Sequence, residues 1–238
     1  RARPKAVISR GAFDSQNVSF WSESEGLYLC YFRTWDGPTP WSGFRSISRV
    51  TSKDFLSWSE PKAMSYGGTP REHLYTNQTQ PYFRAPHIYL SVAARFMPGR
   101  RILSPAQAKA IDVDPGYFSD CSDAVLMSTR GGTLYSRTFM DAFIRPGPGL
   151  ENWVSRTNYP ALGIVGMPGG RLAIHVQKNY GQPTARLVRY TLRSDGFVSV
   201  NGPYAGGEMT TRLLTFQPAA GKDSATCRLL VNCATGAA

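Results

Sequence analysis

The sequence predicts an all-β protein assembled from short strands and tight turns. Among its 238 residues are 23 glycines and 17 prolines, and aromatic residues make up 12%. Frequent turn formers between short apolar runs are typical of antiparallel β architectures. The hydrophobic share of 42% is enough for a substantial core. No run reaches the roughly 18 apolar residues that a membrane-spanning helix needs.

The first four predicted strands have the dimensions of one β-propeller blade. They cover residues 18–21, 27–33, 45–51 and 62–65, so four strands fall within about fifty residues. Polar or Gly/Pro-rich segments separate them, which favours antiparallel pairing of neighbours. Between the third and the fourth, residues 52–58 predict a polar turn that tucks an aromatic side chain inward.

The same rhythm continues more loosely along the chain. Further strands are predicted at 86–93, 124–127, 163–165, 171–176 and 185–192. A short helix is predicted at 104–110, in an insertion. From residue 208 the pattern changes, and 209–216 and 227–233 predict the opening strands of a different β unit. We therefore expect propeller blades over 1–205 and the beginning of a second β domain over 206–238.

The chain is basic, with 27 Lys and Arg against 16 Asp and Glu and a formal net charge of +11. Its arginines are scattered along the sequence, as at Arg33, Arg45, Arg49, Arg84, Arg95, Arg137, Arg156 and Arg186. This pattern predicts a solvated basic surface with a few arginines in a site. The second interpretation of the charge is that the protein binds an acidic glycan. Nucleic acid ranks below it, because no nucleic-acid-binding motif is present.

The sequence predicts no metal site and no cofactor. The four cysteines form no CxxC pair, and the three histidines are far from them in sequence, so the usual zinc-binding spacing is absent. Cys30 lies inside an apolar run and is expected to be a buried strand residue. Neither the oligomeric state nor the cellular location follows from the sequence.

The turn at 52–58, Ser-x-Asp-(x)3-Trp between strands, resembles the blade turn of five-bladed β-propeller glycosidases related to glycoside hydrolase families 32 and 43. A group of bacterial proteins, in which such a propeller precedes a β-sandwich, is more similar still. The segments that carry this resemblance are GAFDSQNVSFW, TSKDFLSWSEP, EHLYTNQTQPYFRAPHIYL, ENWVSRTNYPALGIV and LRSDGFVSV. The resemblance implies a partial five-bladed β-propeller followed by the start of a β-sandwich. It also implies a carbohydrate-active function.

The resemblance explains a short internal repeat in the sequence. Pro-Lys-Ala-Met at 61–64 is nearly repeated as Pro-Lys-Ala-Val at 4–7. In the resembling proteins a strand of this kind closes a blade just before the FDSQN strand. We therefore expect an outer strand at 4–8, with the earlier blades lying upstream of Arg1 and missing from this chain.

Three acids are the candidate catalysts. Glycoside hydrolysis needs two carboxyl groups around one bond, one that donates a proton and one that attacks or activates water. Asp14 opens an apolar strand within a polar cluster, and its alternative role is to cap a turn. Asp123 has the same setting before the strand at 124–127, and its alternative is a loop acid. Glu72 is the candidate general acid, and its alternative is a place in a surface loop.

The predicted sugar-binding residues combine rings with hydrogen-bonding groups, a mixture that ligand sites use. They are Gln16, Asn17, Trp35, Tyr75, Asn77, Gln80, Arg84, His87 and Arg156. Trp35 and Trp41 flank the loop Asp-Gly-Pro-Thr-Pro and are expected to line the funnel of the propeller. For His87 the alternative is a hydrogen-bonded structural role.

Two hypotheses about carbohydrate lead. The first is a glycoside hydrolase that acts on oligo- or polysaccharide through paired carboxylates. The second is a glycan-binding protein without catalysis, with acidic polysaccharide as its ligand. Arg171 favours the second, because the resembling proteins are expected to have a glutamate at that place. A third hypothesis is a purely structural or protein-binding propeller.

Overall fold

The computed structural model describes residues 5–211, 213, 215, 231 and 233. The chain divides into two compact units, Arg1–Gly196 and Phe197–Ala238. Within the second unit the described residues form no helix or strand. The β-sandwich strands predicted at 209–216 and 227–233 fall mainly outside the described residues.

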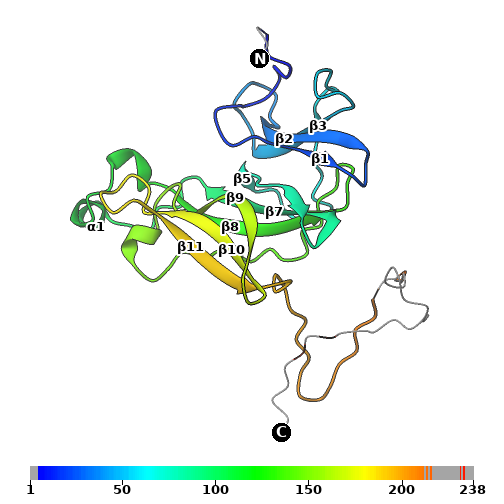
Figure 1. The fold of residues 1–238 in the computed structure, drawn as a ribbon. Coiled ribbons are helices and arrows are strands. Elements are labelled where there is room, and N and C mark those ends of the chain that lie inside the picture. Colours follow the sequence, from blue (N-terminus) through cyan, green and yellow to red (C-terminus); the bar gives the residue numbers. More distant parts are fainter. Residues whose placement is uncertain (1–4, 212, 214, 216–230, 232, 234–238) are drawn as a thin grey trace. The chain divides into compact units, whose positions relative to one another are not determined.

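The first unit is all-β, as predicted, and its strands form three antiparallel sheets (Figure 1). The first sheet is a meander in chain order, with strands β1 (Val18–Ser22), β2 (Leu27–Trp35), β3 (Arg45–Ser52) and β4 (Lys62–Ala63). The central sheet contains β5 (His73–Thr76), β6 (Gln80–Tyr82), β7 (Ala85–Met97) and β8 (Cys121–Thr129). The third sheet contains β9 (Tyr159–Met167), β10 (Arg171–Lys178) and β11 (Arg186–Arg193).

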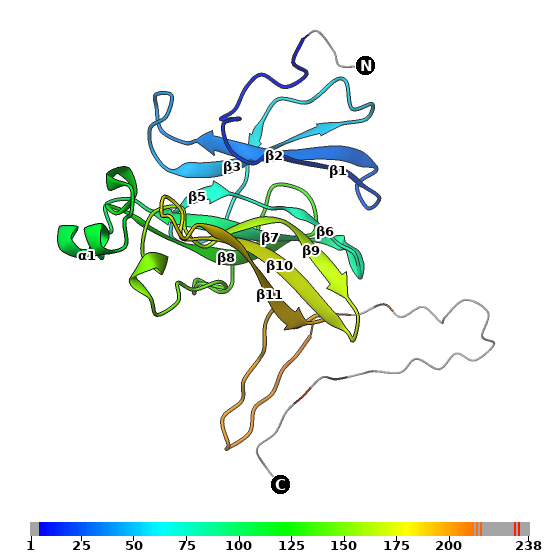
Figure 2. The ribbon, with the colours of Figure 1, turned by 60° about the vertical axis from the view of Figure 1, so that its left-hand side comes forward.

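The three sheets are layered. Figures 1 and 2 both show the central sheet between the other two, and β5 contacts β2 and β3 while β7 and β8 contact β9. Leu29 and Ile47 of the first sheet pack with Val125 of the central sheet in one core. Val92, on the other face of the central sheet, packs with Ile174 of the third. Because successive side chains in a strand point to opposite faces, the central sheet supplies both cores.

The predicted partial five-bladed propeller is wrong. Of the three sheets, the first is a four-stranded meander of the size expected for a blade. In the central sheet β5 and β6 lie one after the other along the same edge of β7, and the third sheet has three strands. In the part of the chain that the structure describes, the sheets form no closed ring. The outer strand expected at 4–8 does not form over the described residues 5–8.

Most of the predicted local elements are confirmed. The helix α1 (Pro105–Ala110) begins after Ser104, which caps it in a reciprocal pair with Gln107. Two short 3-10 helices, η1 (Pro115–Tyr117) and η2 (Leu150–Asn152), flank β8 along the chain. The strands β5 and β6 were not predicted, because the polar run that contains them lacks an apolar alternation.

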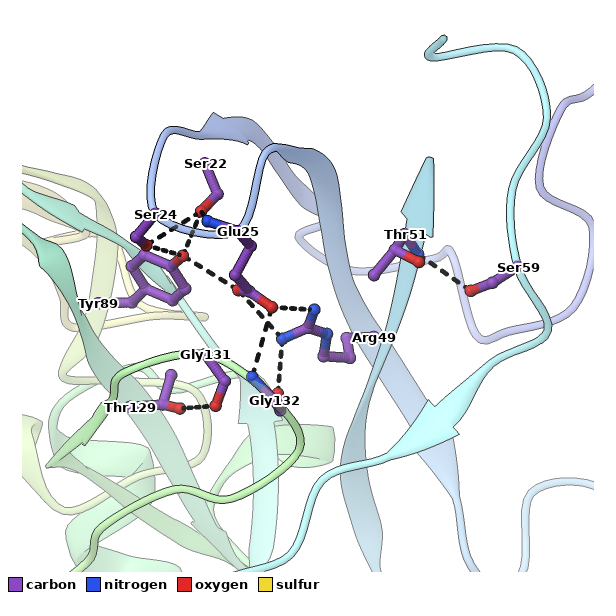
Figure 3. A network of polar contacts seen from close by, with 10 residues as sticks. All are labelled: Ser22, Ser24, Glu25, Arg49, Thr51, Ser59, Tyr89, Thr129, Gly131 and Gly132. Carbon is purple, nitrogen blue, oxygen red and sulfur yellow. Dashed lines mark hydrogen bonds and ion pairs between the residues drawn. The ribbon is translucent and has the colours of Figure 1, made fainter. Parts of the chain in front are cut away.

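A polar network fastens the first sheet to the central sheet (Figure 3). Glu25, in the turn after β1, accepts hydrogen bonds from Arg49 Nη2 at 2.7 Å and from the Tyr89 hydroxyl at 3.0 Å. Arg49 Nη1 donates to the Gly132 carbonyl at 2.6 Å. The Tyr89 hydroxyl, which comes from β7, is also bonded to Ser22. Since each charged group has a partner, the network supports the interface between the two sheets.

Candidate functional site

The candidate site is centred on Tyr75, which lies on a β-bulge. The register between β5 and β7 shifts between Leu74 and Thr76, so Tyr75 is the extra residue of the bulge. A bulge redirects the side chain that it carries. The Tyr75 ring lies 5.8 Å from the Phe96 ring of β7 and 5.4 Å from the Tyr159 ring of β9. Tyr75 thus lies where the central sheet meets the third.

Three arginines surround the Tyr75 ring. The guanidinium carbons of Arg33, Arg45 and Arg156 are 4.7, 5.1 and 5.8 Å from the ring centre. Arg33 and Arg45 belong to the first sheet, and Arg156 precedes β9. Each distance is within the range of a cation–π contact. The ring therefore brings together three positive charges from two sheets.

Arg33 is buried and incompletely paired. It lies on the same face of β2 as Leu29 and Tyr31, so its side chain faces the central sheet, and it is 3% exposed. One nitrogen, Nη2, is paired with Asp14 Oδ1. The Nε and Nη1 atoms are buried without a hydrogen-bond partner. A buried donor without a partner costs free energy, which makes these atoms ready to receive an acceptor.

Arg45 has aromatic neighbours in place of a carboxylate. Its guanidinium lies 4.4 Å from the Trp35 ring centre and 4.7 Å from that of Phe96, and its Nε is buried without a partner. Its backbone N–H donates to His73 Nδ1 at 3.2 Å. Burial, together with the positive charges of Arg33 and Arg156, lowers the pKa of Arg45. Three guanidinium groups lie at this site, and in the described residues Asp14 is the one carboxylate paired with any of them, so the site carries a net positive charge.

Arg156 is held in place by an unusual backbone conformation. Its φ is 59°, a left-handed conformation that few residues other than glycine adopt. Its N–H donates to Ser122 Oγ at 2.9 Å, and its guanidinium lies 4.8 Å from the Tyr117 ring centre. No carboxylate of the described residues forms an ion pair with Arg45 or Arg156. Strained conformations of this kind gather at functional sites.

A hollow of about 360 Å³ lies beside the loop that follows β2 and is bordered by two tryptophans, Trp35 and Trp41. The ring centres of Trp35 and Trp41 are 6.3 Å apart. The remaining lining residues are small or apolar: Gly11, Ala12, Thr34, Gly37, Pro38, Thr39 and Pro40. Since the Arg45 guanidinium stacks on Trp35, this tryptophan joins the hollow to the arginine cluster.

The loop between β2 and β3 presents Trp41 in a fixed position. The Gly37 N–H donates to the Ser42 carbonyl at 3.0 Å, and Ser42 Oγ donates to the Thr39 carbonyl at 2.7 Å. A Cβ atom on Gly37 would lie 2.4 Å from Ser42 Oγ, so only glycine fits there. Trp41 is 60% exposed and has a φ of 65°. An exposed, bulky side chain in a left-handed conformation is a feature typical of ligand contact.

Several predicted site residues gather around Tyr75. Trp35 and Arg156 contact the cluster as described, and Asp14 pairs with Arg33. Gln16, two residues further on, accepts a hydrogen bond from Gln78 Nε2. Asn17 bonds within its own segment, through Nδ2 to the Ser15 carbonyl at 3.1 Å. Asn17 therefore shapes the turn.

The other two predicted acids belong to a separate ion network. Asp123 receives Arg95 Nε at 2.8 Å and Nη2 at 2.7 Å on its two oxygens. Glu72 receives Arg95 Nη1 at 2.8 Å and is also paired with Arg137. Arg95 and Phe96 are neighbours in β7, so their side chains point to opposite faces. The predicted pair Asp14 and Asp123 is thus divided between two arginines.

The remaining predicted binding residues lie away from the cluster. Asn77 is buried, and its Oδ1 accepts the Thr79 N–H at 3.0 Å. Gln80 lies in β6, opposite Leu90 of β7. His87 is exposed near the start of β7. Nine residues of strand separate it from Phe96, which is about 30 Å.

Arg84 and Asp195 form a pair at that distant end. Arg84 Nε donates to both Asp195 oxygens at 3.1 Å, and the Tyr82 hydroxyl donates at 2.7 Å. The Asp195 carboxylate is therefore bound by side chains that lie more than a hundred residues away in the sequence. In the turn at 52–58, by contrast, the Asp54 carboxylate receives the backbone N–H groups of Leu56 and Ser57, both at 2.7 Å.

Sequence reasoning did not single out Arg33 and Arg45 as site residues. A signal was present for Arg33, because it shares the inward-facing alternation of an apolar strand. For Arg45 the sequence holds no comparable signal, since its aromatic neighbours come from three different strands.

Within the described part of the chain, no group of three or more His, Cys, Asp and Glu side chains is placed to hold a metal ion. None of the helices in that part is long and apolar enough to cross a bilayer.

No protein-family model matches the chain, and no curated protein matches it. Among solved structures, an N-acetylgalactosamine deacetylase from F. plautii, crystallised with blood group B trisaccharide, is similar with a TM-score of 0.45 and 10% sequence identity. The similarity covers 74% of this chain and 49% of that chain, so this chain spans about half the length of that neighbour. The neighbour is a carbohydrate-active enzyme, but a similarity at this level carries no argument about activity here.

Proposed function

We propose that this protein binds an acidic carbohydrate at the cluster around Tyr75. The observation that carries the proposal is the convergence of Arg33, Arg45 and Arg156 on one ring, with Asp14 as the one carboxylate paired among them in the described residues. Guanidinium groups match planar carboxylates and sulfates by paired hydrogen bonds. An anion would find unpartnered donors there, namely Nε and Nη1 of Arg33 and Nε of Arg45.

The tryptophan hollow favours a sugar as the body of the ligand. Sugars present apolar ring faces as well as hydroxyls, and aromatic side chains pack against such faces. The volume of about 360 Å³ is within the range of small-molecule sites. An oligosaccharide would then place its acidic unit at the arginines and the neighbouring unit between Trp35 and Trp41.

Binding is better supported than hydrolysis of a glycosidic bond. A glycosidase needs two carboxyl groups that reach one bond. Both oxygens of Asp123 and both oxygens of Glu72 are engaged by arginines, and Asp14 belongs to the other cluster. This geometry favours the non-catalytic alternative that the basic charge and Arg171 already suggested.

Titration calorimetry with trigalacturonate and with its methyl ester tests the proposal. The two ligands share the same sugar rings and differ in charge. We expect the acid to bind more tightly than the ester, and its affinity to fall with added salt, because ionic contacts are screened. Equal binding of the two ligands, or no binding of either, would refute the proposal.

Matched variants locate the site. Arg45→Gln should weaken binding of the acid by about tenfold, the effect of losing one charge-assisted contact. Arg186→Gln removes the same charge from an exposed position on β11 and should leave the affinity within about twofold.

Trp41→Gly should weaken the binding of both the acid and the ester, since the tryptophan contacts the sugar ring and not the charged group. Equal losses of affinity in the two arginine variants would count against this site. An oligothymidylate serves as the nucleic-acid probe, and its tighter binding than that of the acid would also count against the proposal.

A further inference from the structure

The ion pair between Asp14 and Arg33 is asymmetric. The Arg33 side chain is 3% exposed, whereas the Asp14 side chain is 58% exposed. The pair uses Oδ1 of the carboxylate and Nη2 of the guanidinium, and leaves Nε and Nη1 of Arg33 buried without a partner. The arginine is therefore fixed in the interior, while the carboxylate reaches it from the solvent side.

Asp14 belongs to a short bridging segment, residues 13–17, that lies outside the strands. The segment is anchored at one end by the Ala12 N–H, which donates to the Arg33 carbonyl at 2.9 Å. At the other end β1 begins at Val18. In between, Ser15 Oγ donates to the Tyr75 carbonyl at 3.3 Å, a long hydrogen bond. Asp14 can leave Arg33 without breaking either anchor.

We propose that Asp14 occupies the position of the ligand carboxylate, and that an acidic sugar binds by displacing Asp14 from Arg33. This inference rests on the proposed function. One carboxylate leaves the guanidinium for water as another arrives, so the charge at the site is conserved. Because Asp14 is already more than half exposed, its carboxylate returns to water at little cost, and the arriving carboxylate keeps the buried Arg33 guanidinium paired.

The exchange makes Asp14 a specificity residue. A ligand carboxylate can use two nitrogens of Arg33 at once, whereas Asp14 uses one. A neutral sugar brings no anion and cannot replace Asp14 on the buried guanidinium. Asp14 therefore lowers the affinity for every acidic ligand and prevents neutral ligands from reaching the arginine.

The variant Asp14→Asn tests this exchange by calorimetry with trigalacturonate and its methyl ester. We expect the affinity for the acid to rise about fivefold, because the competing charge is gone, and the affinity for the ester to change less than about twofold. Glu60→Gln is the matched control. Glu60 is an exposed carboxylate paired with Arg10, both 75% exposed, so the variant makes the same change of charge in a pair that contains no buried arginine.

The outcomes separate the two proposals. If the wild type binds the acid and Asp14→Asn binds it equally or more weakly, the exchange is overturned and the proposed function stands. Equal gains in Asp14→Asn and Glu60→Gln would also overturn it, as a general effect of charge. If neither the wild type nor Asp14→Asn binds the acid, the proposed function is overturned, and the exchange, which rests on it, is overturned as well. Urea unfolding confirms that each variant is folded, and Asp14→Ser serves as a second variant.

Discussion

Replacing Asp123 by asparagine distinguishes a carboxylate that maintains the fold from one that takes part in chemistry. Asp123 lies in β8 directly opposite Arg95 of β7, and Asp123 is 6% exposed. Arg95 donates to both carboxylate oxygens, at 2.8 and 2.7 Å. The hydrogen bonds to Asp123, and then the charges of Asp123 and Glu72, raise the pKa of Arg95. The guanidinium stays charged and needs its carboxylates.

The size of the effect follows from this geometry. Removing one partner of a buried ion pair costs about 3–5 kcal/mol. Glu72 remains on Nη1 of Arg95 at 2.8 Å and compensates part of the charge, so we expect the lower value, about 3 kcal/mol. With a urea dependence of about 2 kcal/mol per molar, the midpoint of unfolding should fall by about 1.5 M.

Urea unfolding at pH 7, followed by tryptophan fluorescence, measures this shift. Asp120→Asn is the control, because Asp120 forms no ion pair in the described residues. It accepts the Gly99 N–H at 2.7 Å and a long hydrogen bond from Ser119 Oγ at 3.5 Å, and the substitution should cost about 1 kcal/mol or less. If the midpoint of Asp123→Asn lies within about 0.2 M of the wild type, the reasoning is refuted. Asp123 would then contribute too little to stability for a structural role, and its candidacy as a catalytic acid would return.

Two further predictions concern other parts of the first unit. Tyr89→Phe removes the hydroxyl that donates to Glu25 (Figure 3) and should lower the free energy of unfolding by about 1–3 kcal/mol; a loss below about 0.5 kcal/mol would contradict a fastening role for the network. The backbone N–H groups of Ser57 and Leu56 lower the pKa of Asp54 to about 2. The charged carboxylate therefore stabilises the fold fully above its ordinary pKa of 3.8 and loses this effect as the pH falls through about 2. Asp54→Asn should lower the melting temperature at pH 6 and much less near pH 2, and a difference that does not narrow would exclude this carboxylate as its cause.

The local elements could be predicted because their causes are local. β2 is a run of apolar residues between turn formers and β3 carries Ile47 between polar neighbours, and both strands were expected within two residues of their ends. The capped helix α1 and the turn at Asp54 depend on residues two to four positions apart. Patterns that extend over so few positions can be recognised in a single sequence.

The strands β5 and β6 were not predictable for the opposite reason. The run that contains them includes Asn77 and Gln78, polar residues that are almost fully buried. Gln78 Nε2 is satisfied by the Pro160 carbonyl at 2.6 Å, more than eighty residues away. Asn77 and Gln78 lie between β5 and β6, and no local pattern reveals two short strands joined by buried polar residues whose partners come from elsewhere in the chain.

The candidate site likewise contains residues that the sequence could indicate and contacts that it could not. Residue type alone brought Trp35, Tyr75 and Arg156 into consideration, since sugar sites combine aromatic rings with hydrogen-bonding groups. Their contact with Arg45 depends on the bulge at Tyr75 and on the stacking of sheets, neither of which has a sequence signature.

The two acids Asp14 and Asp123 show most clearly what separates sequence from structure. In sequence they are equivalent, each an aspartate in a polar stretch beside an apolar strand. The sequence was sufficient for the all-β class, for most of the strand positions and for the choice of these acids as unusual. The tertiary structure alone decided that Asp123 meets Arg95 in the interior and that Asp14 meets Arg33 from the solvent side. The physical reason is that the role of a carboxylate depends on its burial and on its cation, and strands distant along the chain determine both.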